Sequence, residues 1–203
     1  MTAPASNGAG VFITFEGADG VGKSTQARLL CERLTALGNR VLATREPGGA
    51  PGADDIRALV VNGAVEKWTP LSEALLMSAA RSEHLTHTIR PALARGEIVV
   101  CDRFSDSTMA YQGYAGGVGR DAIDRINAVV VGDDMPALTL ILSGDPAEGL
   151  MRASERAAGD GAAENTEQRF EAKGGAFQKA VHDAFLDIAA RAPDRCVLID
   201  AAG

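Results

Sequence analysis

The sequence is poor in cysteine and histidine. Its three cysteines, Cys31, Cys101 and Cys196, lie far apart and form no C-x-x-C pair. Neither a disulfide framework nor a zinc site of the usual spacing is therefore indicated, and we expect reduced thiols in a cytoplasmic protein. The three histidines also form no convincing set of metal ligands. These shortages argue against small disulfide-bonded domains and zinc-dependent domains.

Long apolar runs and positive charge are also scarce. No run approaches the roughly 18–20 apolar residues that a membrane-spanning helix needs. Residues 1–10, MTAPASNGAG, lack the basic and apolar regions of a signal peptide. The net charge is −7, whereas nucleic acids and anionic membranes attract basic surfaces. We expect neither as a partner, so an anionic ligand has to be bound by a local group of basic residues.

Short apolar runs alternate with segments of helical periodicity. The five runs are residues 11–15, 40–44, 97–101, 138–142 and 196–200. Each is apolar nearly throughout, as expected of parallel strands covered on both faces. Helices are expected at 23–37, about 53–62, 71–95, 105–131 in pieces, 146–157 and 169–191, with Thr69 and Pro70 marking the start of the third. The alternation predicts a doubly wound parallel α/β fold, with a flexible tail at 1–10 and a single domain at 11–203.

A glycine-rich motif joins the first predicted strand to the first helix. Residues 17–24, GADGVGKS, fulfil the pattern G-x-x-x-x-G-K-[ST]. Backbone N–H groups of such a loop surround phosphate oxygens at a helix N-terminus, the lysine bridges the β- and γ-phosphates, and the hydroxyl ligates Mg²⁺. The predicted nucleotide-binding residues are Gly17, Ala18, Asp19, Gly20, Val21, Gly22, Lys23, Ser24 and Thr25, with Ser24 as a magnesium ligand.

Asp102 and Arg103 follow the third predicted strand. The carboxyl end of a parallel strand is where ligands of such sheets bind, so Asp102 is a second candidate magnesium ligand and Arg103 a candidate phosphate ligand. The alternative is that Asp102 caps the next helix. A switch GTPase would typically show D-x-x-G here and N-K-x-D later, and neither occurs in a suitable place.

Three further segments carry polar residues that could converge. They are TREPGG (44–49), EALLMSAARSEHL (73–85) and DSTMAYQG (106–113). Met77, Ser78 and Arg81 are spaced three or four apart, so they can face one cavity from a helix. Each residue also has a structural interpretation, with Met77 in the core and Arg81 in a surface ion pair. The segment ERAAGDGAAENTEQR (155–169) has no apolar period and is expected to be a mobile loop, either a linker or a functional lid.

In this order and spacing, the glycine-rich loop, TREPGG, LLMSAAR, DRF, ST and AYQG resemble the thymidylate kinase family, from about residue 11 to residue 200. The resemblance implies a P-loop nucleoside-monophosphate kinase fold with a five-stranded parallel sheet, a mobile lid and a homodimer. It implies that ATP and Mg²⁺ bind at the loop and that dTMP is phosphorylated to dTDP for dTTP synthesis.

The resemblance also implies roles at the phosphates. Asp19 matches an acidic residue near the dTMP sugar and phosphate, and Arg103 matches an arginine that bridges the donor and acceptor phosphates. Arg57 matches an arginine that reaches the acceptor phosphate. Lys23, Arg103, Asp19 and a lid arginine are the predicted catalytic residues.

Base recognition is assigned by the same resemblance. Arg81 matches a residue that donates to thymine O4, and Gln112 adds a base-edge hydrogen bond. Tyr111 crowds the position of a ribose 2′-OH, while Pro47 and Met77 flank the base. The full predicted substrate site is Glu46, Pro47, Arg57, Met77, Arg81, Arg103, Ser107, Tyr111 and Gln112.

Some family members carry the catalytic arginine in the loop, but positions 18–21 contain none. The lid, about 152–169, should then supply it. Its candidates are Arg152, Arg156 and Arg169, of which Arg156 is favoured. Relatives often have phenylalanine where Met77 stands and an acidic residue where Gln168 stands, and they continue beyond the last strand with another helix, whereas this sequence ends at DAAG.

Two alternatives remain open on the sequence. One is a kinase for another deoxynucleotide or nucleoside. The other is a P-loop ATP-binding switch protein with a macromolecular partner. The clustering of Arg81, Arg103, Tyr111 and Gln112 in acceptor-site segments argues against the second alternative.

Overall fold

The structure is a computed structural model that describes residues 10–145, 147–149, 151–152 and 168–201. The predicted tail at 1–9 and residues 153–167, including Arg156 and most of the predicted lid, lie outside the described residues. So does much of the helix expected at 146–157.

A five-stranded sheet forms the centre of the fold. Its strands are β1 (Val11–Glu16), β2 (Val41–Arg45), β3 (Ile98–Asp102), β4 (Leu138–Ser143) and β5 (Cys196–Asp200). Their order is β2-β3-β1-β4-β5 and all pairs are parallel. Phe15 is in register with Asp102, so the carboxyl ends of β1 and β3 meet at one edge. The five predicted strands are confirmed, with ends that differ by one residue at most.

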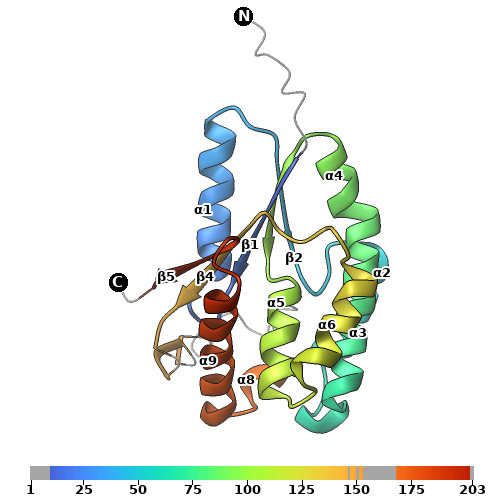
Figure 1. Cartoon of the computed structure of the whole chain (residues 1–203), viewed down its shortest axis with the longest axis vertical. Coiled ribbons are helices and arrows are strands. Elements are labelled where there is room, and N and C mark those ends of the chain that lie inside the picture. The colour runs from blue at the N-terminus through green and yellow to red at the C-terminus, as the bar shows by residue number, and fades with distance from the viewer. Residues whose placement is uncertain (1–9, 146, 150, 153–167, 202–203) are drawn as a thin grey trace, which may run out of the picture.

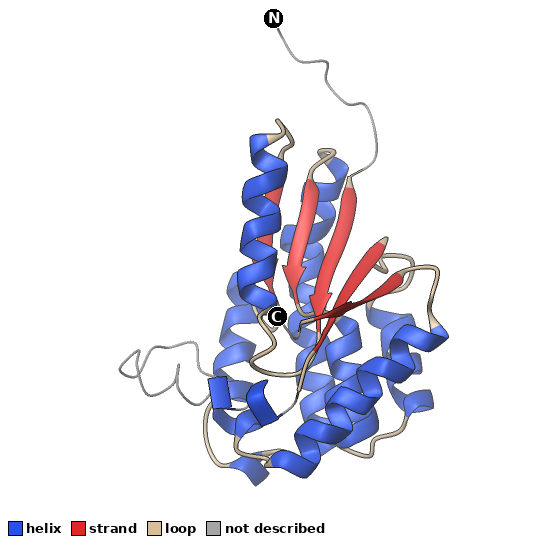
Figure 2. Cartoon of the chain, turned by 90° about the vertical axis from the view of Figure 1, so that its left-hand side faces the viewer, coloured by secondary structure: helices blue, strands red, loops and turns tan. Residues whose placement is uncertain are grey.

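Helices lie on both sides of the twisted sheet (Figures 1 and 2). Their bounds are α1 Lys23–Ala36, α2 Pro51–Val61, η1 Val65–Lys67, α3 Pro70–His84, η2 Leu85–Ile89, α4 Arg90–Ala94, α5 Ser105–Thr108, η3 Met109–Ala115, α6 Arg120–Val130, α8 Gln168–Glu171 and α9 Gly175–Arg191. In the described part of the chain, no helix combines the length and the apolar character that crossing a membrane requires.

The two faces of the sheet bury separate apolar clusters. Alternate residues of a strand point to opposite faces. Phe12 of β1 accordingly packs with Leu85 and Ile89 of η2, whereas Phe15 joins a larger cluster that includes Phe185 of α9. Burial on both faces explains why β1 and β3 are apolar nearly throughout.

The outer strand β5 departs from the predicted burial. Val197 and Leu198 are neighbours and therefore point to opposite faces, yet each is 47% exposed. The expectation that every strand is covered on both faces is wrong for β5. This strand lies at the end of the sheet order and pairs with β4 alone.

The long helix predicted at 71–95 contains a change of helix type. Pro70 occupies its first turn and the Thr69 hydroxyl accepts the Ser72 N–H at 3.3 Å, as the sequence predicts. The wider π-helical turn η2 separates α3 from α4. Pro91 has no N–H to donate to the preceding turn, and a π-type turn accommodates such a break in the hydrogen-bond ladder.

Candidate active site

The glycine-rich loop connects the end of β1 to α1 at the carboxyl edge of the sheet. Gly22 has a φ of 98°, which favours glycine. A Cβ on Gly17 would lie 2.4 Å from the carbonyl oxygen of Leu142 in β4, so the close approach of two strands requires a glycine. The Lys23 ammonium group donates to the carbonyl oxygen of Ala18 at 2.6 Å. The loop thus joins β1 to α1 as the sequence predicts, and the Lys23 side chain lies across it.

Ser24 and Asp102 form the candidate magnesium site. Ser24 lies in the first turn of α1 and Asp102 ends the neighbouring strand β3. The Ser24 hydroxyl donates to Oδ2 of Asp102 at 2.5 Å, while Oδ1 is buried with no hydrogen-bond partner among the described residues. A hydroxyl beside a carboxylate with a spare oxygen fits Mg²⁺ or its bound water. The described residues hold no cluster of three or more histidine, cysteine or acidic side chains suited to a metal, so the nucleotide phosphates would have to complete the coordination.

Arg103 connects the loop to the opposite side of the site. Its φ of 70° is unusual for a residue other than glycine. The guanidinium pairs with Asp19 and donates to the carbonyl oxygen of Gly17 at 3.2 Å, to Ser107 Oγ at 3.1 Å and to the Tyr111 hydroxyl at 3.2 Å. Tyr111 donates in turn to Asp19 at 3.0 Å. The structure thus brings predicted site residues of the loop and of the segment after β3 into one polar group.

Asp19 is a charged anchor for this group. Burial on its own would raise the pKa of its carboxyl, but the nearby Arg103 and Lys23 charges and hydrogen bonds from Tyr111 and Gln178 hold the pKa below its ordinary value. The carboxylate therefore keeps its charge and fixes Arg103 in place.

Glu16 at the end of β1 binds the turn that follows Arg103. Its carboxyl group accepts hydrogen bonds from Phe104 N at 2.8 Å, Ser107 N at 3.2 Å and Ser107 Oγ at 2.6 Å. Burial, together with the negative charge of Asp106, raises the pKa of Glu16 to about 8. Glu16 therefore holds the backbone of the turn that follows Arg103 and does not line the cavity itself.

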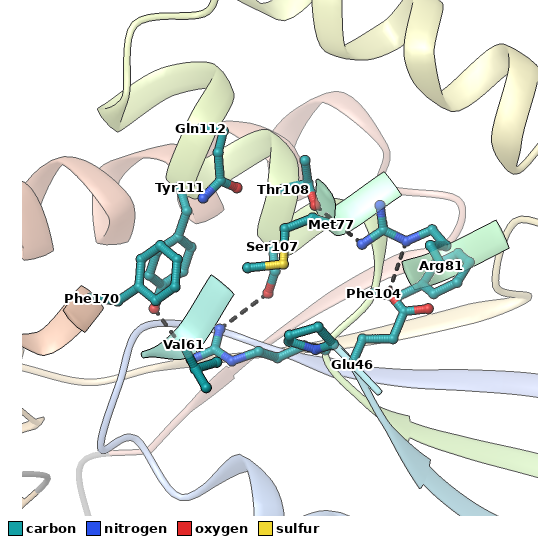
Figure 3. Close-up of a pocket in the computed structure, with 12 residues that line it drawn as sticks. Glu46, Val61, Met77, Arg81, Phe104, Ser107, Thr108, Tyr111, Gln112 and Phe170 are labelled. Atoms are coloured by element: carbon teal, nitrogen blue, oxygen red, sulfur yellow. Dashed lines mark hydrogen bonds and ion pairs between the residues drawn. The ribbon is translucent and has the colours of Figure 1, made fainter. Parts of the chain in front are cut away.

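A cavity opens beside Arg103. It has about 450 Å³ of empty space, counting the part open to solvent. Its lining combines apolar walls with a few polar groups, as is typical of a small-molecule site. The residues are Glu46, Pro47, Val61, Met77, Arg81, Arg103, Phe104, Ser107, Thr108, Tyr111, Gln112 and Phe170 (Figure 3).

Arg81 is buried in the wall of this cavity. Its Nε donates to Glu46 at 2.8 Å and Nη2 donates to Thr108 Oγ1 at 3.1 Å, while His84 lies 3.0 Å from the other Glu46 oxygen. Nη1 is buried and has no hydrogen-bond partner among the described residues. An unpaired buried donor costs about 1–3 kcal/mol, so it indicates a ligand acceptor. The ion pair is buried, not at the surface as the structural interpretation of Arg81 proposed.

All of the predicted substrate residues except Arg57 line the cavity. Arg57 is buried in α2 and donates to the carbonyl oxygen of Pro47 at 2.8 Å, behind the cis Glu46–Pro47 peptide. Ser78, expected on the same helical face as Met77, donates instead to the Ala74 carbonyl oxygen at 2.7 Å. Ser78 does not line the cavity, so that part of the helical-face prediction is wrong.

Sequence reasoning missed four lining residues: Val61, Phe104, Thr108 and Phe170. Thr108 lies one helical turn before Gln112, and this spacing could have revealed it. Phe170 follows Arg169 far along the chain, and no local pattern links it to the cavity. Arg169 itself, a candidate for the lid arginine, is buried and forms an ion pair with Glu73.

The chain matches known proteins along nearly its whole length. The family model described as thymidylate kinase matches residues 15–203. The thymidylate kinase of Caulobacter vibrioides is 53% identical over 95% of this chain and 88% of its own, and that of Ruegeria pomeroyi is 48% identical over 96% and 88%.

A solved structure is similar as well. The crystal structure of thymidylate kinase from Ehrlichia chaffeensis superposes with a TM-score of 0.75 at 38% identity, covering 95% of this chain and 93% of that chain. Sequence relatives, the fold and the site geometry agree. The chain belongs to the thymidylate kinase family.

Proposed function

We infer that this chain transfers the γ-phosphoryl group of ATP to dTMP and forms ADP and dTDP. The observation that carries this inference is the cavity beside the glycine-rich loop. In its wall the buried Nη1 of Arg81 has no hydrogen-bond acceptor among the described residues. Family membership with relatives named thymidylate kinase supports the same reaction.

Donor and acceptor would meet at Arg103. ATP occupies the loop at residues 17–25, and the dTMP phosphate lies at the end of the cavity lined by Arg103 and Ser107. A phosphate oxygen of dTMP forms a bond to the γ-phosphorus as the bond to the ADP oxygen breaks. Such a transfer depends on positioning and on neutralising charge, which Lys23 and Arg103 supply. Arg57 supports the acceptor side through Pro47.

Base selection would occur deeper in the cavity. Arg81 Nη1 donates to thymine O4, where cytosine carries an amino group that cannot accept. Met77 and Pro47 flank the base, Gln112 contacts its edge, and Tyr111 crowds the space of a ribose 2′-OH. The Glu46 carboxylate holds Arg81 for this contact.

Mg²⁺ would be held by Ser24 and Asp102 with the phosphates of ATP. When bound, the ion shields phosphate charge and polarises the transferring group. The spare buried Oδ1 of Asp102 supports this assignment.

The lid is proposed to supply one more cation. We assign this role to Arg156 within the lid at about 152–169, in a single kinase domain that spans residues 11–203. Arg169 is held by Glu73, which leaves Arg152 as the competing candidate.

We further propose a cytoplasmic homodimer without a nucleic-acid partner. Exposed apolar side chains support dimerisation: Leu59 of α2, Leu71 and Leu75 of α3 and Val129 of α6. These helices lie along one flank of the molecule (Figure 1). Sedimentation equilibrium should give the mass of two chains, and the mass of one chain at micromolar concentration would contradict the dimer.

The function is tested with a panel of acceptors. The purified protein, ATP and Mg²⁺ are combined with dTMP, dUMP, dCMP or thymidine, and dTDP or its counterpart is quantified. We expect the highest kcat/KM for dTMP. Equal turnover of dCMP or thymidine would indicate another kinase, and ATP hydrolysis without transfer to any acceptor would indicate a switch protein.

A further inference from the structure

A buried carboxylate lies behind the cavity wall. Glu73 in α3 is 1% exposed and accepts hydrogen bonds from three side chains. Arg169 of α8 forms an ion pair with it, Lys173 Nζ lies 3.1 Å from its Oε2, and Gln112 Nε2 donates to Oε2 at 3.2 Å. Glu73 and Met77 are four residues apart on the same helix, so Glu73 continues the cavity-facing row of α3.

The position of Glu73 is fixed from the far side. Arg169 also donates to the carbonyl oxygens of Ala64, at 2.9 Å, and Val60, at 3.3 Å. Its guanidinium is thereby tied to the end of α2 and to the segment after it. With its charge balanced by Arg169 and Lys173, Glu73 presents acceptor oxygens to Gln112 in one defined place.

This contact determines which way the Gln112 amide faces. The amide has a donating NH₂ group and an accepting oxygen, and an ionised carboxylate only accepts. The NH₂ group must therefore face Glu73, and the oxygen must face elsewhere. In Figure 3 the oxygen of Gln112 is turned toward Thr108 and Met77, which line the cavity, and the nitrogen is turned away from them.

The cavity wall then presents one donor and one acceptor to a base. The donor is Nη1 of Arg81 and the acceptor is Oε1 of Gln112. Thymine complements this pair with its O4 acceptor and its N3–H donor. Cytosine has an amino group and an unprotonated N3 at these positions, so both contacts would be mismatched. A site with oriented polar groups rejects such an analogue because the groups are left unpaired.

We propose that Glu73 is a positioning residue for base selectivity: it holds the Gln112 amide with its oxygen toward the base, so that the cavity accepts a pyrimidine with O4 and N3–H and rejects one with a 4-amino group. The proposal rests on the proposed function and adds a residue that does not itself touch the substrate.

The test is Glu73→Gln, which nearly preserves shape but can donate as well as accept. Gln112 is then free to rotate. The ratio of kcat/KM for dTMP to that for dCMP should fall about tenfold, the value of one mismatched hydrogen bond. The ratio of dTMP to dUMP should not change, because uracil and thymine share this edge and differ at the methyl group. A second variant, Glu73→Asp, keeps the charge, but its shorter side chain withdraws the oxygen from Gln112. It should lower the ratio of dTMP to dCMP in the same selective way, and it replaces Glu73→Gln if that variant does not fold.

Two controls separate this role from a structural one. In a Gln112→Ala background, Glu73→Gln should cause no further fall in the dTMP to dCMP ratio. Asp106→Asn removes another buried carboxylate, which Arg195 contacts at 2.7 and 2.8 Å, and should lower stability without altering that ratio. An unchanged ratio in foldable Glu73 variants, or a parallel fall against dUMP, would overturn the proposal. Failure of the wild-type protein to prefer dTMP would instead overturn the proposed function.

Discussion

The glycine-rich loop and the acceptor cavity lie at the same edge of the sheet, but they are built in different ways. The loop is one unbroken segment, residues 17–24, and we propose that it binds phosphate mainly with backbone groups. The cavity is lined by side chains from the segment after β2, from α2 and α3, from the residues after β3 and from α8. Arg103 contacts both regions.

This difference has consequences for recognition and for mutation. A site made of backbone groups depends on the local conformation of one segment, and the triphosphates it binds are shared by many proteins. A site made of side chains depends on the packing of several elements, and each side chain contributes its own contact to one base. Single substitutions should therefore separate the two regions kinetically.

The largest effect is expected from a residue that we assign to neither region. Arg156→Ala should lower kcat about 10³-fold with ATP and dTMP, because an arginine that stabilises the charge of the transferring phosphate contributes at least that much. Single-turnover kinetics would measure the transfer step directly. Arg152→Ala is the matched control within the lid and should retain most of the activity. The reverse pattern would assign the role to Arg152 and leave Arg156 as a solvated charge.

A change at Arg81 should affect the cavity and leave the loop intact. Arg81→Ala removes a charged donor to the base, and the KM for dTMP should rise about 10- to 100-fold. The KM for ATP should change little, because Arg81 contacts no residue of the loop. Steady-state kinetics with each substrate varied in turn measures both values.

His84→Gln provides the control for Arg81. His84 contacts the same Glu46 carboxylate but does not line the cavity. This variant should lower thermal stability with a much smaller rise in the KM for dTMP. If Arg81→Ala raised both KM values equally, Arg81 would be a structural residue and the two regions would not be separable.

The sequence predicts the strands and the loop because these depend on local patterns, whereas most of the cavity is predicted by the resemblance to a known family. Apolar runs of five residues and the G-x-x-x-x-G-K-[ST] spacing are each visible in a short window. Val197 shows the limit: its apolar run predicts a covered strand, but its exposure depends on which elements pack beside β5.

The contacts between segments could not be predicted in the same way. Nothing near Phe170 indicates that it lines a cavity with Met77, and nothing near Arg169 indicates that it pairs with Glu73. These contacts join residues about 90 or more positions apart in the chain and arise from tertiary packing. The position of Glu73 near the cavity could have been predicted from the sequence, since it lies four residues before Met77 on one helical face.

The last effect concerns the stability of the protein and not its kinetics, and it arises at Glu16, which lies between the two regions. Its pKa is raised by burial from 4.5 to about 8 in the folded protein. Below pH 4.5 the carboxyl is protonated in both the folded and unfolded states. Between pH 4.5 and 8 only the folded state retains this proton, so rising pH should lower the free energy of unfolding, by at most about 1.4 kcal/mol per pH unit from this group.

Glu16→Gln removes this titration while keeping an acceptor for Phe104 N. Urea unfolding of both proteins from pH 5 to 9 isolates the contribution of Glu16 as the difference between the two curves. The wild-type protein should lose more stability than the variant up to pH 8, after which the two should run parallel. If the curves ran parallel throughout, Glu16 would be ionised when folded, and its three hydrogen bonds would outweigh its burial. The turn that carries Arg103 would then be held by a permanent charge, and the link between loop and cavity would not respond to pH.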